Sequence, residues 1–222
     1  MKIESFWKNC SIVIPCRSNE SEQFKLLNDL ASFAEESEIF IVEAHRGHNL
    51  RSSNLPQNPN VKIVSTSPGR AKQLNYGAQL ATRKFLWFLH ADSRFIPDTV
   101  SDLKALTNLD EETLYYFKLR FQNDGPKPCV LNAFGANMRS QLFKMPFGDQ
   151  SYLLSKQIFE RIGKFNEELN YAEDFEFIRQ ANRVKIPIEG LPIKISTSAR
   201  KYQQRGWVKT TAEHLNFLVR NW

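Results

Sequence analysis

Cysteine is scarce in this chain, with only Cys10, Cys16 and Cys129 among 222 residues. Their odd number and irregular spacing exclude a disulfide framework and a zinc site from the expected features. Long apolar runs are also missing, because no segment approaches the roughly 20 apolar residues of a membrane-spanning helix. Residues 1–8 carry charged side chains and lack the apolar run of a secretion signal. We therefore expect a cytoplasmic protein.

Neither sign of charge dominates most of the sequence, although the formal net charge is +6. The basic excess lies near the end of the sequence, in Arg200, Lys201, Arg205, Lys209 and Arg220. Such an excess fits a solvated basic face, a pocket for a phosphorylated substrate or an anionic membrane surface. Aromatic residues do not alternate with these charges in a stripe, so we expect no nucleic-acid partner.

Hydrophobic residues make up 41% of the sequence, which is enough for a substantial core and excludes a disordered chain. The length fits one domain, which we expect to span residues 1–222. Apolar runs predict strands at 11–15, 39–43, 61–64 and 85–89. Apolar residues at helical spacing predict helices at 21–36, 69–82 and 98–107. This alternation predicts an α/β fold with a mostly parallel sheet.

The second half of the sequence is less regular. Its patterns predict an antiparallel strand at 114–121, extended segments at 150–154 and 186–195, and helices at 130–143, 155–162, 172–183 and 207–222. Pro187 and Pro192 indicate a sheet edge, because proline cannot donate a hydrogen bond to a neighbouring strand. The last helix is amphipathic, and its apolar side either packs on the core or lies on an anionic membrane.

The apolar run at 85–89 ends abruptly in His90, Ala91 and Asp92. Ligands of open α/β sheets bind beyond the carboxyl ends of the strands. A carboxylate at such an end can hold a divalent cation against a phosphate, because hard cations prefer oxygen ligands. The alternative is that Asp92 only caps a turn.

A second candidate site is the segment 68–77, which opens a helix after a strand. A helix N-terminus attracts anions, and Arg70 and Lys72 add positive charge there. The segment matches neither the P-loop nor the dinucleotide glycine pattern. An ordinary helix start with solvated basic residues is the alternative.

Two further segments combine acidic or small residues. Glu173, Asp174 and Glu176 stand at a helix start, where acids favour the helix dipole, but one of them can serve as a general base. Gly148, followed by Asp149, either lets the backbone approach a ligand or forms a simple turn.

Taken in order, these segments resemble the family-2 glycosyltransferases with a GT-A fold. The similarity is highest to a small bacterial group of arsenosugar-biosynthesis-like, or selenodomain-associated, glycosyltransferases. The residues that carry it are IVIP at 12–15, GRAKQLNYGA at 69–78, FLHADS at 88–93, PFGDQ at 146–150, ED at 173–174, TSAR at 197–200 and RG at 205–206.

The resemblance implies a Rossmann-like, three-layer α/β/α GT-A fold with a mixed, mostly parallel sheet. It implies a hexosyltransferase that moves a sugar, with inversion and with Mg²⁺ or Mn²⁺, from a nucleotide sugar to a hydroxyl acceptor. A UDP-sugar is the expected donor, and the acceptor is a lipid-linked or small molecule. Residues 1–110 would form the nucleotide-sugar-binding half and residues 111–222 the acceptor-side half.

The resemblance also implies roles for single residues. Asp174, with Glu173, would supply the catalytic base, and Asp92 would bind the metal. Glu43 would receive the nucleotide base, and Arg70 would face the diphosphate. The full nucleotide-binding set is Pro15, Glu43, Arg70, Gln73, Asn75, His90, Ala91 and Asp92. The pocket for donor and acceptor would include Gly148, Asp149, Gln150, Arg200 and Arg205.

Two positions depart from the family pattern. The pair Asn19 and Glu20 lies one residue further from Pro15 than in the family, and Ala44 and His45 replace the glycine and serine that usually follow the acidic residue. These departures motivate an alternative, a non-catalytic nucleotide-sugar-binding module that has kept the fold.

Overall fold

The computed structural model describes residues 5–17, 22–44 and 58–221 of the chain. Asn19, Glu20 and His45, which the family resemblance singles out, lie outside these ranges. No helix in the described ranges is long and apolar enough to cross a membrane.

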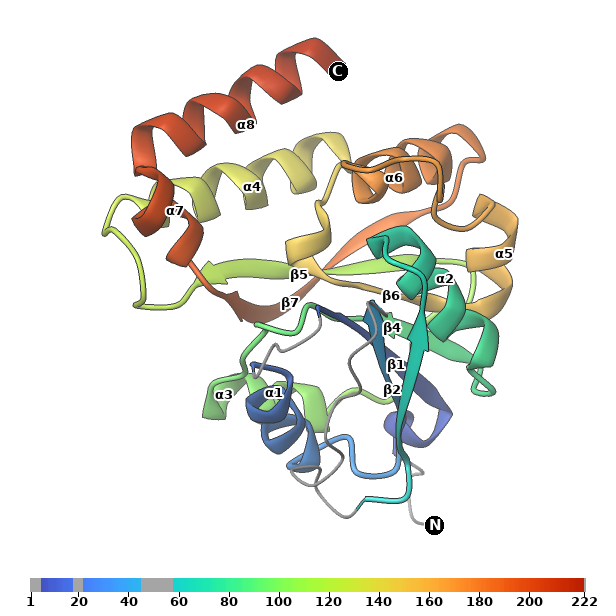
Figure 1. Cartoon of the computed structure of the whole chain (residues 1–222). Helices are drawn as coiled ribbons and strands as arrows, with labels where there is room; N and C mark the ends of the chain where they lie inside the picture. The colour runs from blue at the N-terminus through green and yellow to red at the C-terminus, as the bar shows by residue number, and fades with distance from the viewer. Residues whose placement is uncertain (1–4, 18–21, 45–57, 222) are drawn as a thin grey trace.

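A seven-stranded sheet runs through the molecule in the order β3-β2-β1-β4-β6-β5-β7 (Figure 1). β1 is parallel to β2 and β4, and β2 is parallel to β3. β6 is antiparallel to both of its neighbours, β4 and β5, whereas β5 and β7 are parallel. The strands are β1 (Cys10–Cys16), β2 (Glu38–Ala44), β3 (Val61–Thr66), β4 (Phe85–Phe88), β5 (Leu114–Phe121), β6 (Tyr152–Ser155) and β7 (Ile188–Thr197). The sheet is therefore mixed and mostly parallel, which confirms the predicted fold class.

Helices cover both faces of this sheet and complete the predicted three layers. The helix α1 and the helix α3 lie on one face, while α2, α5 and α6 lie on the other (Figure 1). The helices are α1 (Glu22–Ala31), α2 (Arg70–Leu80), α3 (Pro97–Lys104), α4 (Cys129–Phe143), α5 (Lys156–Ile162), α6 (Glu173–Arg183), α7 (Arg200–Arg205) and α8 (Trp207–Asn221), with the 3₁₀ turns η1 (Phe6–Asn9) and η3 (Gly148–Gln150).

Burial on both faces explains why β4 is apolar throughout. Phe85 and Trp87 belong to the core layer under α1 and α3, whereas Leu86 and Phe88 belong to the layer under α2 and α5. Side chains alternate between the faces of a strand, so a strand covered by helices on both sides needs an unbroken apolar run.

Three segments differ in detail from the sequence-based predictions. The strand at 114–121 is antiparallel only to β6 and pairs in parallel with β7. The helix predicted at 21–36 ends at Ala31, and residues 200–205 form the short helix α7, which the pattern does not predict. β7 lies at the sheet edge, as its prolines indicate.

Close packing fixes the start of α2 at the carboxyl ends of β1 and β2. A Cβ atom on Gly77 would lie 2.4 Å from Cγ1 of Val13, so only glycine lets the helix approach this closely. One turn earlier, the side chain of Gln73 donates hydrogen bonds to the carbonyl oxygens of Cys16 (2.7 Å) and Val42 (2.6 Å). These contacts place the first turn of α2 over the ends of both strands.

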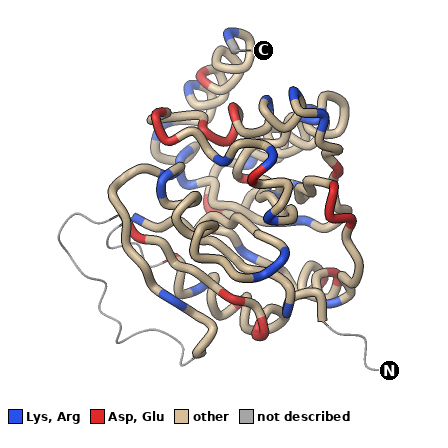
Figure 2. The backbone as a smooth tube through the Cα atoms, turned by 90° about the vertical axis from the view of Figure 1, so that its right-hand side faces the viewer, with Lys and Arg blue, Asp and Glu red and all other residues tan. Residues whose placement is uncertain are grey.

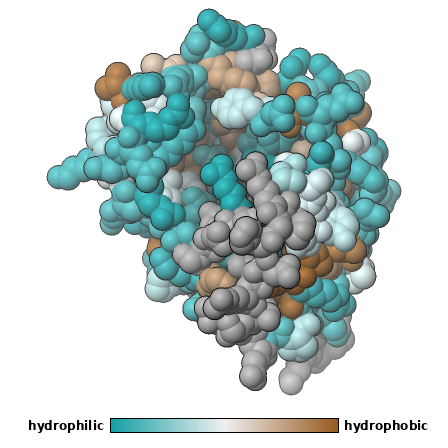
Figure 3. Space-filling model, in the orientation of Figure 1, coloured by the Kyte–Doolittle hydropathy of each residue, from teal (hydrophilic) through white to brown (hydrophobic). Residues whose placement is uncertain are grey.

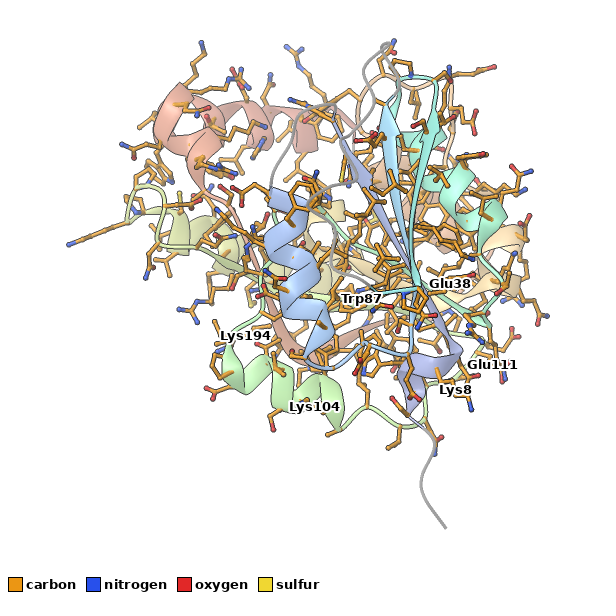
Figure 4. All side chains as sticks on the ribbon, turned by 60° about the horizontal axis from the view of Figure 1, so that its bottom comes forward. Lys8, Glu38, Trp87, Lys104, Glu111 and Lys194 are labelled. Atoms are coloured by element: carbon orange, nitrogen blue, oxygen red, sulfur yellow. The ribbon has the colours of Figure 1, made fainter. Side chains whose placement is uncertain are left out.

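At the other end of the sheet, Glu38 joins three elements (Figure 4). It is 6% exposed and accepts hydrogen bonds from Ser11 Oγ (2.8 Å), Lys62 Nζ (3.1 Å) and the backbone N–H of Thr82 (2.8 Å). Burial alone would raise the pKa of Glu38, but these donors together lower it below its ordinary value of 4.5. The ionised carboxylate is therefore part of the folded structure.

Replacing Glu38 tests this account of the sheet. Glu38→Gln should lower the free energy of unfolding at pH 7 by about 1–3 kcal/mol, because it removes charge-assisted hydrogen bonds. The folded-state pKa lies below 4.5, so the contribution is complete above that pH and is lost as the pH falls through the folded-state pKa. Urea unfolding at several pH values should show the variant and the parent protein converging in acid. Glu36→Gln, at an exposed position nearby, is the control, and a loss that does not change with pH would contradict the prediction.

Candidate active site

A cleft of about 1610 Å³ opens at the carboxyl ends of the parallel strands. Pro15 and Cys16 from β1, Ala44 from β2 and the residues after β4 line its base. The first turns of α2 and α6 line two sides, and α4, α7 and α8 line the rest. The cleft therefore combines residues from both halves of the chain at the sheet edge where α/β proteins bind ligands.

Arg70, the first residue of α2, is at the centre of a charged cluster in this cleft. Its Nη1 donates a hydrogen bond to Oε1 of Glu173 at 2.5 Å and lies 3.9 Å from Oδ2 of Asp174. Both carboxylates belong to the first turn of α6. Glu173 is only 5% exposed, and a carboxylate so buried needs a cation partner to offset its lost hydration.

His90 lies on the other side of the same guanidinium group. Its Nε2 contacts Nη2 of Arg70. Because a guanidinium group only donates, Nε2 is the acceptor and the ring proton is on Nδ1. Burial, followed by the charge of Arg70, holds the pKa of His90 well below its ordinary value of 6.5, although a hydrogen bond with the backbone of Gly148 acts in the opposite direction. The imidazole is therefore neutral at pH 7 and can orient Arg70 without repelling it.

Gly148 allows the guanidinium group of Arg70 and the carboxylate of Asp174 to lie close together. Its backbone N–H donates to Oδ2 of Asp174 at 2.7 Å. A Cβ atom at this position would lie 2.7 Å from Nη2 of Arg70 and 2.8 Å from Oδ2 of Asp174. The glycine of the PFGDQ segment is thus required by the site's packing.

Asp149 and Arg139 line the cleft, and each has one buried polar atom without a hydrogen-bond partner among the described residues. Burial raises the pKa of Asp149 to about 6, while Arg139 acts to lower it. Oδ1 of Asp149 and Nη2 of Arg139 are buried and have no hydrogen-bond partner among the described residues. Arg139 also stacks on Phe147, with its guanidinium carbon 3.8 Å from the ring centre. Buried polar atoms without partners indicate a place for a polar ligand.

Asp92 lies on the loop after β4 and is oriented by two segments of the second half. Thr197 Oγ1 donates to its Oδ1 at 3.3 Å, and Gln122 Nε2 donates to its backbone oxygen at 2.8 Å. Asp92 lines the cleft together with Ala91 and His90. The end of β7 therefore helps to aim this carboxylate.

Several predicted site residues support the scaffold. Asn75 holds the segment after α5, through hydrogen bonds with the backbone of Phe165 and with Glu167, and does not line the cleft. The buried side chain of Gln150 joins η3 to α4 and β5, accepting a hydrogen bond from Ser140 at 2.6 Å and donating one to the Phe117 carbonyl oxygen at 3.3 Å. Gln73 lines the cleft, but its amide donates to the strand ends described above.

Besides Gly148, which lies between Arg70 and Asp174, three other predicted residues are not among those that line the cleft. Glu43 is buried at the end of β2, where Ala44 lines the cleft in its place. Arg200 pairs with Glu22 and Asp124, and Arg205 pairs with Glu213. From the same short helix, Lys201 and Tyr202 line the cleft instead.

The sequence predicts that Lys201 and Trp207 close over the donor diphosphate or the acceptor, and both line the cleft. It did not identify the other residues that α4, α7 and α8 contribute. One signal was available: Arg139 is the only charged residue within α4, and an isolated charge in an otherwise uncharged helix indicates a paired or functional position. The other lining residues follow from the docking of α8, which no pattern specifies. From α7 and α8 they include Tyr202, His214 and Phe217.

The donor atoms in the cleft fit a hard divalent cation that is shared with a ligand. No cluster of three His, Cys, Asp or Glu side chains suited to a metal occurs in the described part of the chain. Asp92 and the unsatisfied Oδ1 of Asp149 offer carboxylate oxygens, the ligands that Mg²⁺ and Mn²⁺ prefer. Phosphate oxygens commonly complete the coordination of such ions.

Comparisons with known proteins agree with this architecture. The mannosyltransferase PcManGT from Pyrobaculum calidifontis, solved with GDP-Man and Mn²⁺, has a TM-score of 0.65 at 15% identity, over 100% of this chain and 68% of its own. The crystal structure of S. aureus TarS has a TM-score of 0.63 at 20% identity over 86% of this chain. This chain spans only 37% of that TarS chain, and 58% of a shorter form of TarS in complex with UDP-GlcNAc.

These structural similarities show a GT-A fold and confirm that prediction. None of the curated proteins matches the sequence at a significant level. Residues 11–165, which make up more than half of the chain, match the sequence profile of glycosyl transferase family 2. The match covers strands β1 to β6, apart from the first residue of β1, together with the Arg70 and Asp92 segments. The chain therefore belongs to glycosyl transferase family 2.

Proposed function

We propose that this protein transfers a sugar from a nucleoside diphosphate sugar, foremost a UDP-sugar, to a hydroxyl acceptor with inversion at the anomeric carbon. The observation that carries this proposal is the contact of Arg70 with the carboxylates of α6 inside one cleft. That contact puts a diphosphate-binding group beside two candidate general bases. In this proposal residues 1–110 bind the donor, and residues 111–222 form the acceptor side.

The donor diphosphate would lie at the first turn of α2. Free backbone N–H groups and the helix dipole attract anions there, and an arginine can grip a phosphate with two hydrogen bonds. Relatives of the same fold have been solved with UDP, UDP-GlcNAc and GDP-Man, which supports a nucleotide sugar as the ligand. Pro15 and Ala44, at the strand ends, leave space for the nucleoside.

Asp92 would hold the divalent cation, with Asp149 as a second oxygen donor. Mg²⁺ or Mn²⁺, when bound, supplies positive charge that stabilises the leaving diphosphate. The Mn²⁺ in the mannosyltransferase structure supports this assignment. Hydrogen bonds from Thr197 and Gln122 hold Asp92 in the lining of the cleft.

Asp174 suits the role of catalytic base better than Glu173. The side chain of Glu173 is 7% exposed and its Oε1 is occupied by Arg70 at 2.5 Å. The side chain of Asp174 is 19% exposed, and its distance to Arg70 is 3.9 Å. Hydrogen bonds from the backbone N–H groups of Gly148 and Phe175 fix the carboxylate, which leaves it oriented to take a proton from an acceptor hydroxyl.

The motifs PFGDQ and GRAKQLNYGA support a place within the arsenosugar-biosynthesis-like group, and we propose a cytoplasmic enzyme of the hexosyltransferase type. The group's label is not evidence for a particular sugar. The acceptor side is built from α4, α7 and α8, whose apolar lining residues suit an acceptor with an apolar part.

Nucleotide binding tests the donor site. Isothermal titration with UDP, GDP, ADP, CMP and dTDP should show one nucleoside diphosphate whose affinity falls at least about tenfold without Mn²⁺, because a bound cation would offset the charge of the phosphates beside Asp92. Asp92→Asn should cause a similar loss. Asp98→Asn, an exposed aspartate at the start of α3, is the matched control. An affinity that changes neither when Mn²⁺ is removed nor in Asp92→Asn would contradict the assignment of Asp92 as the metal-binding residue.

Turnover tests the base. Asp174→Asn should lower kcat by about 10²- to 10⁴-fold while donor binding persists, because only the proton acceptor is lost. Glu173→Gln should instead raise the donor KM, because Arg70 loses the carboxylate that positions it to bind the diphosphate. Nucleotide release from the donor that binds, measured with a panel of hydroxyl acceptors, gives both constants.

The control for this experiment is Glu176→Gln on the same helix, whose carboxylate pairs with Arg179 and Arg183 outside the cleft. Full turnover in Asp174→Asn would refute the role of Asp174. Donor binding by the parent protein without turnover with any acceptor would favour the non-catalytic binding module.

A further inference from the structure

Helix α4 exposes an apolar face that no described element covers. Val130, Phe134, Met138 and Leu142 follow one another at a spacing of four residues and so share one side of the helix. All four are exposed, Phe134 by 64% and Val130 by 69%. The opposite side of α4 is the buried one, because Cys129, Ala133 and Ser140 are the buried residues of this helix.

Helix α8 presents a second apolar stripe beside the first. Val208, Ala212, Leu215 and Val219 share one side of the helix, and Val219 is 82% exposed. Asn132 of α4 holds the two helices together, accepting a hydrogen bond from Trp207 Nε1 at 2.6 Å and donating one to Thr211 Oγ1 at 3.0 Å. Figure 3 shows brown and tan surface near the top of the molecule, where α4 and α8 lie in Figure 1.

This α4–α8 surface adjoins the active-site cleft. Leu131 is 62% exposed and Leu215 is 58% exposed, and both also line the cleft. The apolar surface therefore continues through these two leucines from the outside of the helices into the cleft.

Basic residues predominate in the two segments that carry this surface, although Arg200 pairs with Glu22 and Asp124, and Arg205 pairs with Glu213. Residues 127–144 and 200–221 contain eight of the 30 Lys and Arg residues but only one of the 24 Asp and Glu residues. The rest of the chain therefore has 22 basic and 23 acidic residues, so the whole positive net charge of the protein resides in these two segments. Figure 2 shows α8 at the top with more blue than red.

We propose that the α4–α8 surface docks on an anionic lipid bilayer and that the cleft receives a lipid-linked hydroxyl acceptor from it. Helices with an apolar stripe and flanking Lys and Arg residues lie in the interface of anionic membranes. A second copy of the chain is a poor occupant, because two surfaces of the same strong positive charge repel each other. The docking follows from the surface alone, whereas the lipid-linked acceptor rests on the proposed function.

Flotation of the purified full-length protein with vesicles tests the docking. The protein should float with vesicles that contain phosphatidylcholine and phosphatidylglycerol, much less with phosphatidylcholine alone, and less as salt is raised. The double variant Phe134→Glu and Val219→Glu should bind anionic vesicles at least tenfold more weakly. Neither residue lines the cleft, so the variant should keep the nucleotide affinity of the parent protein, which also shows that it is folded.

The control is Ser101→Glu with Ala105→Glu, which adds the same charge at exposed positions at the end of α3, far from this surface (Figure 1), and should float like the parent protein. Absence of flotation with anionic vesicles, or equal flotation of the double variant, would overturn the docking. A dimer in sedimentation that the double variant abolishes would assign the surface to a second copy and also overturn it. Flotation without any nucleotide binding would uphold the docking and refute the proposed function.

Discussion

The ion pair between Arg70 and Glu173 is the interaction on which the cleft depends. It joins the first turn of α2, set by the parallel strands of the first half, to the first turn of α6 in the second half. The backbone before α6 has an uncommon conformation at this ion pair. Ala172 has a left-handed φ of 62°, which few residues with a side chain adopt. This conformation begins the helix so that Glu173 and Asp174 both line the cleft. A neutral His90 on the other side of Arg70 completes the arrangement.

The second half of the chain adds further residues around the Arg70–Glu173 ion pair. The reversed strand β6 and the 3₁₀ turn η3 bring Gly148 between Arg70 and Asp174, at a place where no side chain fits. Helix α4 adds Arg139, which lies near the acidic Asp149, and α7 adds Lys201. The positive side chains of Arg70, Arg139 and Lys201 thus line the cleft and suit an anionic ligand. Helix α8 adds apolar and aromatic side chains to the lining.

Sequence reasoning predicted the features that depend on local periodicity. The apolar run of β4, the prolines of β7 and the order of strands and helices are sufficient for the α/β fold and the position of Asp92 at a strand end. It could not separate binding residues from scaffold residues within a motif. Asn75 and Gln150 stand in the matching segments, but their amides hold the backbone of distant loops and strands. Arg139 and most of the lining residues of α8 reach the cleft through tertiary docking, for which the sequence offers only the isolated charge in α4.

The most direct test of the account is a crystal structure of the protein with Mn²⁺ and the nucleoside diphosphate that it binds. We expect the metal at Asp92, the diphosphate beside Arg70 at the start of α2, and the nucleoside over the ends of β1 and β2. A nucleotide bound elsewhere, such as on Arg200 and Arg205 outside the cleft, would contradict the account.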